Sequence, residues 1–421
     1  MGHKIEKIEN LDATFSAPPS KAHTLRALFI SSLADGKSVL KNALNADDQI
    51  VAANALSSFG AQIDFKGDDF IVKGTGGDLK EPKKDIFVEN SGVSARFLLP
   101  FAALAKSDCV IDGTARMRQR PLGELISSLS TLGVRIDSQN GFLPLKVHGV
   151  TFAGGSCSIK SDESSQFLSA ILLSAPYTKK GIHAKIEGEM KSKPYVDITV
   201  DCMRSFGIPT VCRQYKEFFV SGNSHYRAQK YQIEGDYSSA SYFFAAAAIS
   251  GGKVKVKNLN ADSKQGDKFF LKILERIGCS IEHGNDYVTV RGPEAATLLP
   301  IEIDMANYPD IVPTLAVALA FANGRSVIKN IGHLAVKESN RIESICSNLS
   351  ACGIKNRAGA DFIEIQGAKP HAASINTFGD HRVAMAFSIM GLAVDGIEIE
   401  NPQVVSKSYP NFFEELSKAG G

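Results

Sequence analysis

Long apolar segments recur along the chain, and each begins with a small group of polar or charged residues. Six such segments span residues 21–36, 90–108, 164–181, 238–252, 310–324 and 380–396. Their last residues follow one another after 72, 73, 71, 72 and 72 positions. So regular a period predicts six equivalent supersecondary units, each built around one buried helix.

A second series of glycines keeps the same period. Shorter amphipathic runs, such as residues 48–59 and 122–132, end at Gly60, Gly133, Gly207, Gly278 and Gly353. Alternating stretches follow them and end at Gly74, Gly149, Gly222, Gly292 and Gly367. We therefore expect each unit to contain a strand, an amphipathic helix, two further strands and then a buried helix.

Six units divide into two groups of three, which predicts an α/β protein of two domains. The polar stretch 223–229 is the best linker candidate, and the N-terminal strand, residues 5–15, can pair with the C-terminal half. The predicted domains are therefore 18–229 and 1–17 plus 230–421. Hinges are expected near 15–20 and 223–235, because the chain crosses between the domains twice.

Composition indicates a large globular protein. Of its 421 residues 44% are apolar and 22% charged, and the net charge of +2 gives no basic field for nucleic acid. No signal peptide is recognised, and the apolar runs are shorter than the ~20 residues that span a bilayer. The seven cysteines have no metal-binding spacing. We expect a cytoplasmic monomer with no metal, no cofactor, and no nucleic-acid or membrane partner.

The starts of the six buried helices carry the candidate chemistry. A helix N-terminus has free N–H groups and a partial positive charge, so it attracts anions. The polar groups there are Ser20-Lys21 with Arg26, Asn90-Ser91-Gly92 with Arg96, Ser164-Ser165-Gln166, Ser238-Ser239, Asp310, and Asp380-His381-Arg382. Ordinary N-caps explain Asn90 and Ser238-Ser239. Two hydroxyls and an amide in a row at Ser164 exceed what one cap needs, and the cations near Lys21 oppose the helix dipole unless an anion binds.

Three further groups of cations lie in polar contexts. Residues 116–121, Arg-Met-Arg-Gln-Arg-Pro, are either a solvated basic loop or a ligand site, with Pro121 in the first turn of a helix. Residues 337–341 are expected to start a helix on which Lys337 and Arg341 repel each other unless an anion lies between them. Lys407, near the C-terminus, is by default a surface lysine.

These residues together resemble the motifs of the enolpyruvyl transferases, over essentially the whole chain. The matching motifs, in order, are Pro19-Ser20-Lys21 with Arg26, Asn90-Ser91-Gly92, Gln119-Arg120-Pro121, Ser164-Ser165-Gln166-Phe167, Ser192-Lys193-Pro194-Tyr195, Pro309-Asp310, Lys337-Glu338 with Arg341, Asp380-His381-Arg382, and Lys407 with Pro410. The resemblance implies a two-domain inverse α/β barrel, or α/β prism, of six repeated units with mixed strands around buried parallel helices.

The resemblance also implies a reaction and two anionic substrates. A carboxyvinyl group would pass from phosphoenolpyruvate to the 5-hydroxyl of shikimate 3-phosphate, with release of phosphate. Domain closure over the two ligands is expected, since anions would remove the repulsion between cationic faces.

The resemblance implies roles for single residues. Ser164, Ser165 and Ser192 would hold the shikimate phosphate, Gln166 would touch both ligands, and Arg26 would bind the shikimate carboxylate. The phosphate of phosphoenolpyruvate would bind Lys21, Gly92, Arg120 and Lys407, and its carboxylate would bind Arg341 and Arg382. Asp310 with Lys337 would deprotonate the hydroxyl, Glu338 and Lys21 would donate and return protons, and His381 would support them.

Three positions depart from the family pattern, and all three concern the acceptor. Ala22 replaces a serine, Val93 a threonine and His333 an asparagine. One lost hydrogen bond to a charged group is worth about 1.5–3 kcal/mol. The acceptor therefore binds more weakly or is a relative of shikimate 3-phosphate, whereas Gly92 leaves room for the inhibitor glyphosate.

Other functions stay open from the sequence. A related transferase acts on UDP-N-acetylglucosamine, but it carries an asparagine where this chain has Ala22, and a loop cysteine that is missing between Cys109 and Arg120. A non-catalytic anion-binding relative would have no use for Asp310 and Glu338 beside cations. A nucleic-acid-binding ring of repeated units is the third alternative. The near-balanced charge of this chain and its lack of clustered aromatic residues argue against it.

Overall fold

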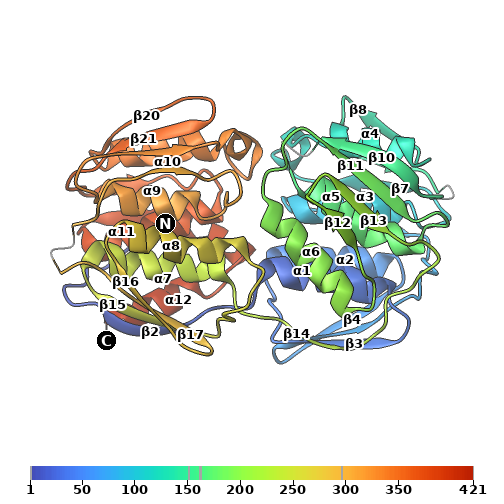
Figure 1. The fold of residues 1–421 in the computed structure, drawn as a ribbon, viewed down its shortest axis with the longest axis horizontal. Coiled ribbons are helices and arrows are strands. Elements are labelled where there is room, and N and C mark those ends of the chain that lie inside the picture. The colour runs from blue at the N-terminus through green and yellow to red at the C-terminus, as the bar shows by residue number, and fades with distance from the viewer. Residues whose placement is uncertain (1, 150–151, 161–163, 295–296, 421) are drawn as a thin grey trace. The chain divides into compact units, whose positions relative to one another are not determined.

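The computed structural model describes residues 2–149, 152–160, 164–294 and 297–420. The chain forms two compact units (Figure 1): a first unit, Pro19–Ile233, and a second unit made of Met1–Pro18 and Glu234–Gly421. Both ends of the predicted second domain, residues 1 and 421, lie outside the described residues. The division falls four residues after the predicted position 229/230, because residues 230–232 form a strand of the first unit.

The first unit contains three repeats. The first is α1 (Lys21–Leu33), β3 (Lys37–Lys41), α2 (Asp47–Ser58), β4 (Gln62–Lys66), β5 (Asp69–Lys73) and the distant β14 (Lys230–Gln232). The second is β6 (Ile86–Phe87), α3 (Gly92–Ala102), β7 (Cys109–Asp112), η1 (Met117–Gln119), α4 (Gly123–Thr131), β8 (Ile136–Gln139) and β9 (Phe142–Val147). The third is β10 (Gly155–Lys160), α5 (Gln166–Ser174), η2 (Ala175–Tyr177), β11 (Ile182–Glu187), α6 (Lys193–Ser205), β12 (Val211–Arg213) and β13 (Glu217–Val220).

The second unit repeats the same order. It begins with β1 (His3–Lys4) and β2 (Asp12–Ser16), followed by α7 (Tyr237–Ser250), β15 (Lys253–Lys257), η3 (Gly266–Lys268), α8 (Phe269–Arg276), β16 (Ser280–His283) and β17 (Tyr287–Arg291). The next repeat is β18 (Glu302–Asp304), α9 (Val312–Ala320), β19 (Arg325–Lys329), η4 (Gly332–Val336), α10 (Arg341–Ala351), β20 (Lys355–Ala358) and β21 (Phe362–Gln366). The last is β22 (Ala373–Ile375), α11 (His381–Ala393), β23 (Ile397–Ile399), η5 (Pro402–Lys407), α12 (Phe412–Ser417) and η6 (Lys418–Gly420).

The six sheets of the described chain share one topology. Five of them have four strands. The sheet β6-β7-β9-β8 is an example: its first two strands are parallel and its other neighbours antiparallel. The sixth, β1-β23-β22, has three strands. The period read from the sequence is thus present in the fold. The prediction omitted short strands before buried helices, such as β6 and β18, since two or three residues are too few for an alternating pattern.

The ends of the chain complete the second unit. β2 pairs in parallel with β15, and β1 pairs with β23. The N-terminal strands thus pair with strands of the C-terminal half of the chain. The single strand predicted over residues 5–15 is wrong, because β1 and β2 are separate strands that belong to two different sheets.

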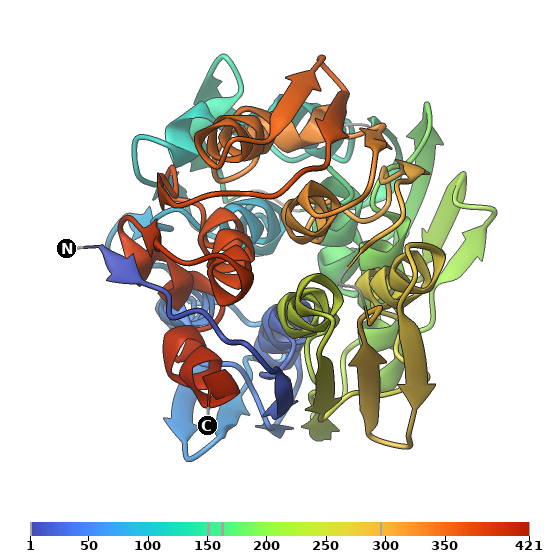
Figure 2. The ribbon, with the colours of Figure 1, turned by 90° about the vertical axis from the view of Figure 1, so that its left-hand side faces the viewer.

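Each unit has a core of central helices surrounded by sheets. Figure 2 looks onto the second unit, where α7, α9 and α11 lie side by side inside the ring of strands, and the contacts among these three helices agree. All nine residues of α9 are buried, as expected for a helix that is apolar on every side. Their N-termini position the residues described next.

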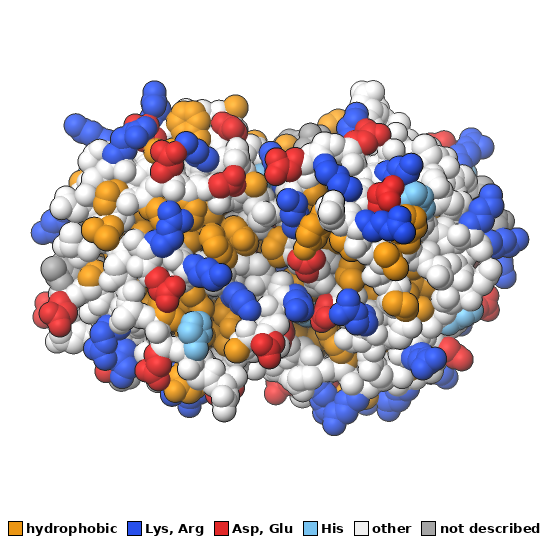
Figure 3. Space-filling view, in the orientation of Figure 1, with side chains coloured by type: hydrophobic (Ala, Val, Ile, Leu, Met, Phe, Trp, Pro, Cys, Tyr) orange, Lys and Arg blue, Asp and Glu red, His pale blue; other side chains and the backbone are white. Residues whose placement is uncertain are grey.

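No helix of the described chain is long and apolar enough to cross a membrane. On the face shown in Figure 3, lysine and arginine side chains of each unit alternate with aspartate and glutamate.

Candidate active site

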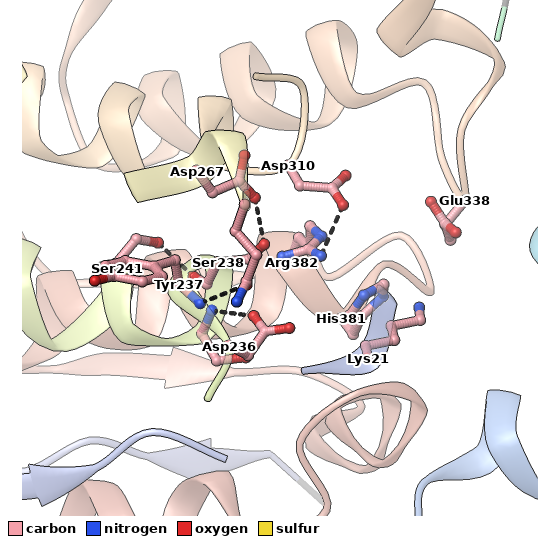
Figure 4. Close-up of polar contacts among 12 residues, drawn as sticks. Lys21, Asp236, Tyr237, Ser238, Ser241, Asp267, Asp310, Glu338, His381 and Arg382 are labelled. Atoms are coloured by element: carbon pink, nitrogen blue, oxygen red, sulfur yellow. Dashed lines mark hydrogen bonds and ion pairs between the residues drawn. The ribbon is translucent and has the colours of Figure 1, made fainter. Parts of the chain in front are cut away.

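The second unit gathers a cluster of charged residues at the starts of its central helices, here called the second-unit cluster. Asp310 precedes α9, Arg341 begins α10, and Arg382 lies in the first turn of α11. Asp310 joins both arginines: its Oδ1 accepts from Arg341 Nη1 at 2.9 Å and its Oδ2 from Arg382 Nη2 at 2.8 Å. Figure 4 shows Asp310 bonded to Arg382. Two repeats, one with Asp310 and Arg341 and the next with Arg382, thus meet at one carboxylate.

Arg341 binds three carboxylates at once. Besides Asp310, Asp380 accepts from its Nε at 2.8 Å and Glu338 from its Nη2 at 2.9 Å. Its side chain is only 1% exposed. Burial alone would lower the pKa of Arg341, but Asp380, Glu338 and Asp310 outweigh burial and raise this pKa above its ordinary value. Arg341 is therefore a fixed cation.

The same field acts on Asp310. Burial would raise the pKa of Asp310, but attraction to Arg382, Arg341 and Lys337 is stronger and holds it well below the usual range, against a smaller opposing effect of Glu338. Asp310 is thus ionised near neutral pH. So low a pKa makes it an acceptor of hydrogen bonds but a weak base.

Asp380 orients the start of α11. It is the N-cap, and its Oδ1 accepts from Arg382 N at 2.9 Å while its Oδ2 binds Arg341. His381 is buried beside it, with Nδ1 3.6 Å from Asp380 Oδ1. Arg382 also donates to the hydroxyl of Tyr242 at 3.4 Å. One capping carboxylate therefore fixes both arginines of the cluster.

Lys337 and Glu338 precede α10, which corrects the expected helix start at 337. The N-cap of α10 is Asn340, and Lys337 is the C-cap of the 3-10 helix η4. Lys337 and Arg341 are therefore not neighbours on one helix face, and the expected repulsion between them is replaced by the contacts of Arg341 with carboxylates. Lys407 ends η5 and is nearly buried rather than a surface side chain.

The first unit gathers a second set of polar residues, here called the first-unit cluster. Lys21 begins α1 and forms an ion pair of 2.7 Å with Asp48. Ser20 is the N-cap, and its hydroxyl also lies 3.0 Å from Nδ1 of His23. Asp48, at the start of α2, thus partly offsets the cation that opposes the dipole of α1.

Gly92 and Arg120 lie in direct contact. Gly92 begins α3, whose N-cap is Ser91 rather than Asn90. A β-carbon on Gly92 would lie 2.5 Å from Cζ of Arg120. Pro121 precedes α4, whose first residue is Gly123, so it does not mark the first helical turn. The structure therefore places the backbone of Gly92 against a guanidinium.

The serine group begins α5. Ser165 is the N-cap without a capping side-chain bond, and Gln166 N donates to Ser164 Oγ at 3.3 Å. Gln166 Oε1 accepts from Arg96 Nη1 at 2.7 Å. Ser192 precedes α6 with a left-handed φ of 57°, a conformation that is strained for serine. Since α5 and α6 pack together, both groups of serines belong to one pair of helices.

Arg26 has protein partners in this structure. Its Nε donates to Thr199 Oγ1 at 2.7 Å, Nη2 to Tyr195 O at 2.9 Å and Nη1 to Ala22 O at 3.0 Å. Burial lowers its pKa to about 10. Arg26 therefore links α1 to α6. Its binding of a substrate carboxylate stays a prediction.

Several contributors escaped the sequence patterns. Asp48 pairs with Lys21, and Asp236, not Ser238 or Ser239, caps α7 by accepting from Ser239 N at 2.7 Å. Asp48 sits in an amphipathic run with the pattern of any surface helix, so no local signal marks it. The residues of each cluster come together only through the packing of the repeats.

The fold and the two clusters define a two-domain α/β protein with charged and polar groups gathered at the starts of its helices. The chain matches the family described as EPSP synthase (3-phosphoshikimate 1-carboxyvinyltransferase) over residues 5–416. It is similar to the 3-phosphoshikimate 1-carboxyvinyltransferases of Trichormus variabilis, 38% identical with 98% and 97% of the two chains covered, and of Methanospirillum hungatei, 40% identical with 96% and 95% covered. The chain belongs to the EPSP synthase family.

Solved structures agree with this fold. EPSP synthase from Acinetobacter baumannii has a TM-score of 0.82 at 24% identity, with 100% of this chain and 98% of that chain covered. The enolpyruvyl transferase NikO from Streptomyces tendae has a TM-score of 0.82 at 17% identity, with 100% and 97% covered. At these identities the likeness concerns the fold.

Proposed function

We propose that the protein transfers the carboxyvinyl group of phosphoenolpyruvate to the 5-hydroxyl of shikimate 3-phosphate and releases phosphate. This is a step of the shikimate pathway to chorismate and the aromatic amino acids. The observation that carries the proposal is the carboxylate of Asp310 held by the buried Arg341 and Arg382, in a chain that matches the family over residues 5–416.

The donor binds through cations in this proposal. Lys21, Arg120, Lys407 and the backbone of Gly92 hold the phosphate of phosphoenolpyruvate, and Gln166 contacts both ligands. Arg341 and Arg382 hold the carboxylate of the donor, for which planar guanidinium groups are suited. Both arginines already bind Asp310, so the donor uses their remaining N–H groups or displaces one of these bonds.

The acceptor binds mainly to the first-unit cluster. Ser164, Ser165 and Ser192 hold its phosphate, and Arg26 binds the carboxylate on its ring. Lys21, Lys337 and Asp310 also contact the acceptor. Ala22 and Val93 offer no hydroxyl there, and His333 is buried on η4. Because all three positions concern the acceptor, the test varies the acceptor.

The reaction needs proton transfer and charge stabilisation. Asp310 takes the proton of the hydroxyl as its oxygen attacks C2 of the donor, while Glu338 or Lys21 supplies a proton to the methylene carbon. These transfers reverse when phosphate leaves, and Lys337 and His381 stabilise the charges. The cost of burying these charged groups is offset by their pairing.

The test is phosphate release by the purified protein. Phosphoenolpyruvate is supplied with shikimate 3-phosphate, and in parallel with unphosphorylated shikimate and with UDP-N-acetylglucosamine. Release only with shikimate 3-phosphate supports the proposal, release with another acceptor favours a homologous transferase, and no release favours a non-catalytic anion-binding relative. The proposal includes a monomeric state, which sedimentation velocity tests.

A further inference from the structure

A further carboxylate, that of Asp267, lies buried beside Asp310 of the second-unit cluster. Asp267 belongs to η3 and is 3% exposed. Its Oδ2 accepts a hydrogen bond from Ser238 Oγ in the first turn of α7. Figure 4 shows Asp267 and Asp310 next to each other, with Ser238 and Arg382 below them. None of the roles assigned above uses Asp267.

The surroundings of Asp267 carry both signs of charge. Asp310 faces it from the residues before α9, Arg382 from α11 and Asp236 from the start of α7. Tyr308 stacks on Phe269 with ring centroids 4.5 Å apart, and burial and the charge of Asp267 raise the pKa of Tyr308. On its own segment, Lys268 donates to the carbonyl of Ala261 at 2.9 Å. Asp267 and Asp310 are therefore both attracted by the positive charge of Arg382.

The two carboxylates have opposite proton affinities. Burial, reinforced by the charge of Asp310, raises the pKa of Asp267 to about 7, although Ser238 and Arg382 oppose the shift. The pKa of Asp310 stays well below its usual range. Near neutral pH, Asp267 is therefore the member of the pair that gains or loses a proton.

We propose that Asp267 is a positioning residue that, when ionised, makes Asp310 a stronger base. The inference rests on the proposed function, in which Asp310 accepts the proton of the hydroxyl. A negative charge on Asp267 repels that on Asp310 and competes for Arg382, so that it favours protonation of Asp310. No atom of Asp267 joins the reaction, in which the hydroxyl proton moves to Asp310 as the new C–O bond forms.

The test compares pH profiles of kcat for the full chain and for Asp267→Asn, which fixes a neutral side chain of equal size. Wild-type kcat should fall below about pH 7, as Asp267 gains its proton. The variant should be about tenfold slower at pH 8.5, the equivalent of one pKa unit in Asp310, and equal to the wild type within about twofold at pH 6. Titration of the substrates cancels in this ratio.

Two further variants separate this role from a structural one. Asp262→Asn removes an exposed carboxylate from the same loop and should keep the wild-type profile. Ser238→Ala removes the hydroxyl that stabilises the ionised form, so the fall in kcat should move to higher pH. A constant ratio of wild type to Asp267→Asn across pH overturns the inference, as does a variant with a raised KM and an unchanged pH dependence. An inactive wild type refutes the proposed function instead.

Discussion

The backbone of Gly92 lies against the guanidinium of Arg120, so closely that a β-carbon would be 2.5 Å from Cζ and from Nη1. Gly92→Ala therefore displaces Arg120 from its present position. We predict a rise of about tenfold or more in KM for phosphoenolpyruvate, the equivalent of one weakened hydrogen bond to a charged group. Steady-state kinetics measure it, and an unchanged KM would show that Arg120 does not bind the donor.

Gly123→Ala is a matched control for this change. Gly123 also begins a helix of the first unit, and a β-carbon there meets only the Cα of Gly141 at 4.0 Å. This variant should keep the wild-type KM within about twofold. An equal effect of both substitutions would point to general damage to the unit.

The same open position predicts sensitivity to glyphosate. Because Gly92 has no side chain, the wild type should be inhibited, and phosphoenolpyruvate should relieve the inhibition competitively. Gly92→Ala should weaken the inhibition. Inhibition that is absent at millimolar glyphosate, or that phosphoenolpyruvate does not relieve, contradicts the prediction.

Asp310→Asn should separate binding from chemistry. The amide keeps the size of the side chain but cannot accept the proton, so kcat should fall by about a hundredfold or more. Donor affinity, measured by calorimetry, should be unchanged or tighter, since Arg341 and Arg382 lose a competing carboxylate. Asp304→Asn, at an exposed position of the same unit, is the control, and substantial turnover in Asp310→Asn would remove Asp310 from the mechanism.

Arg341→Ala should be strongly destabilising. Removal of the buried cation leaves Asp380, Glu338 and Asp310 without their common partner. We expect a loss of about 3–5 kcal/mol in the free energy of unfolding, measured with urea. Arg357→Ala removes the exposed ion pair with Glu364 and should cost less than about 1 kcal/mol; similar losses for the two variants would contradict the structural role of Arg341.

Asp267 should make stability fall as pH rises. Its folded pKa of about 7 exceeds the ordinary value of 3.8, so its contribution is complete below about pH 4 and is lost as pH rises through about 7. The loss is on the order of 4 kcal/mol. Asp310, whose pKa is lowered, acts in the opposite sense at acidic pH. In urea titrations, the stability of Asp267→Asn relative to the wild type should increase between pH 5 and pH 8, and a constant difference would argue against the raised pKa.

Much of the fold follows from the sequence because the repeats are built from strong local signals. Apolar helices such as α9, closed by glycine turns at a fixed period, can be recognised without any tertiary information. The strands β6 and β14 cannot, since they are short and their partners lie far away in the sequence.

The site followed less completely from the sequence. Motif spacing identified Asp310, Arg341 and Arg382, which the structure joins. It did not reveal that Arg341 contacts three carboxylates or that Arg26 links α1 to α6, because these contacts depend on how separate repeats pack. Asp267 was missed for the same reason, since its neighbours Ser238 and Asp310 belong to other segments of the chain.

The sheets that contain β14, β1 and β2 have a consequence for synthesis of the protein. The first sheet of the first unit is complete only once residues 230–232 have been synthesised, and residues 3–16 pair with β23 and β15, which are synthesised much later. A ribosome therefore releases β1 and β2 long before the strands that complete their sheets in the second unit have been made.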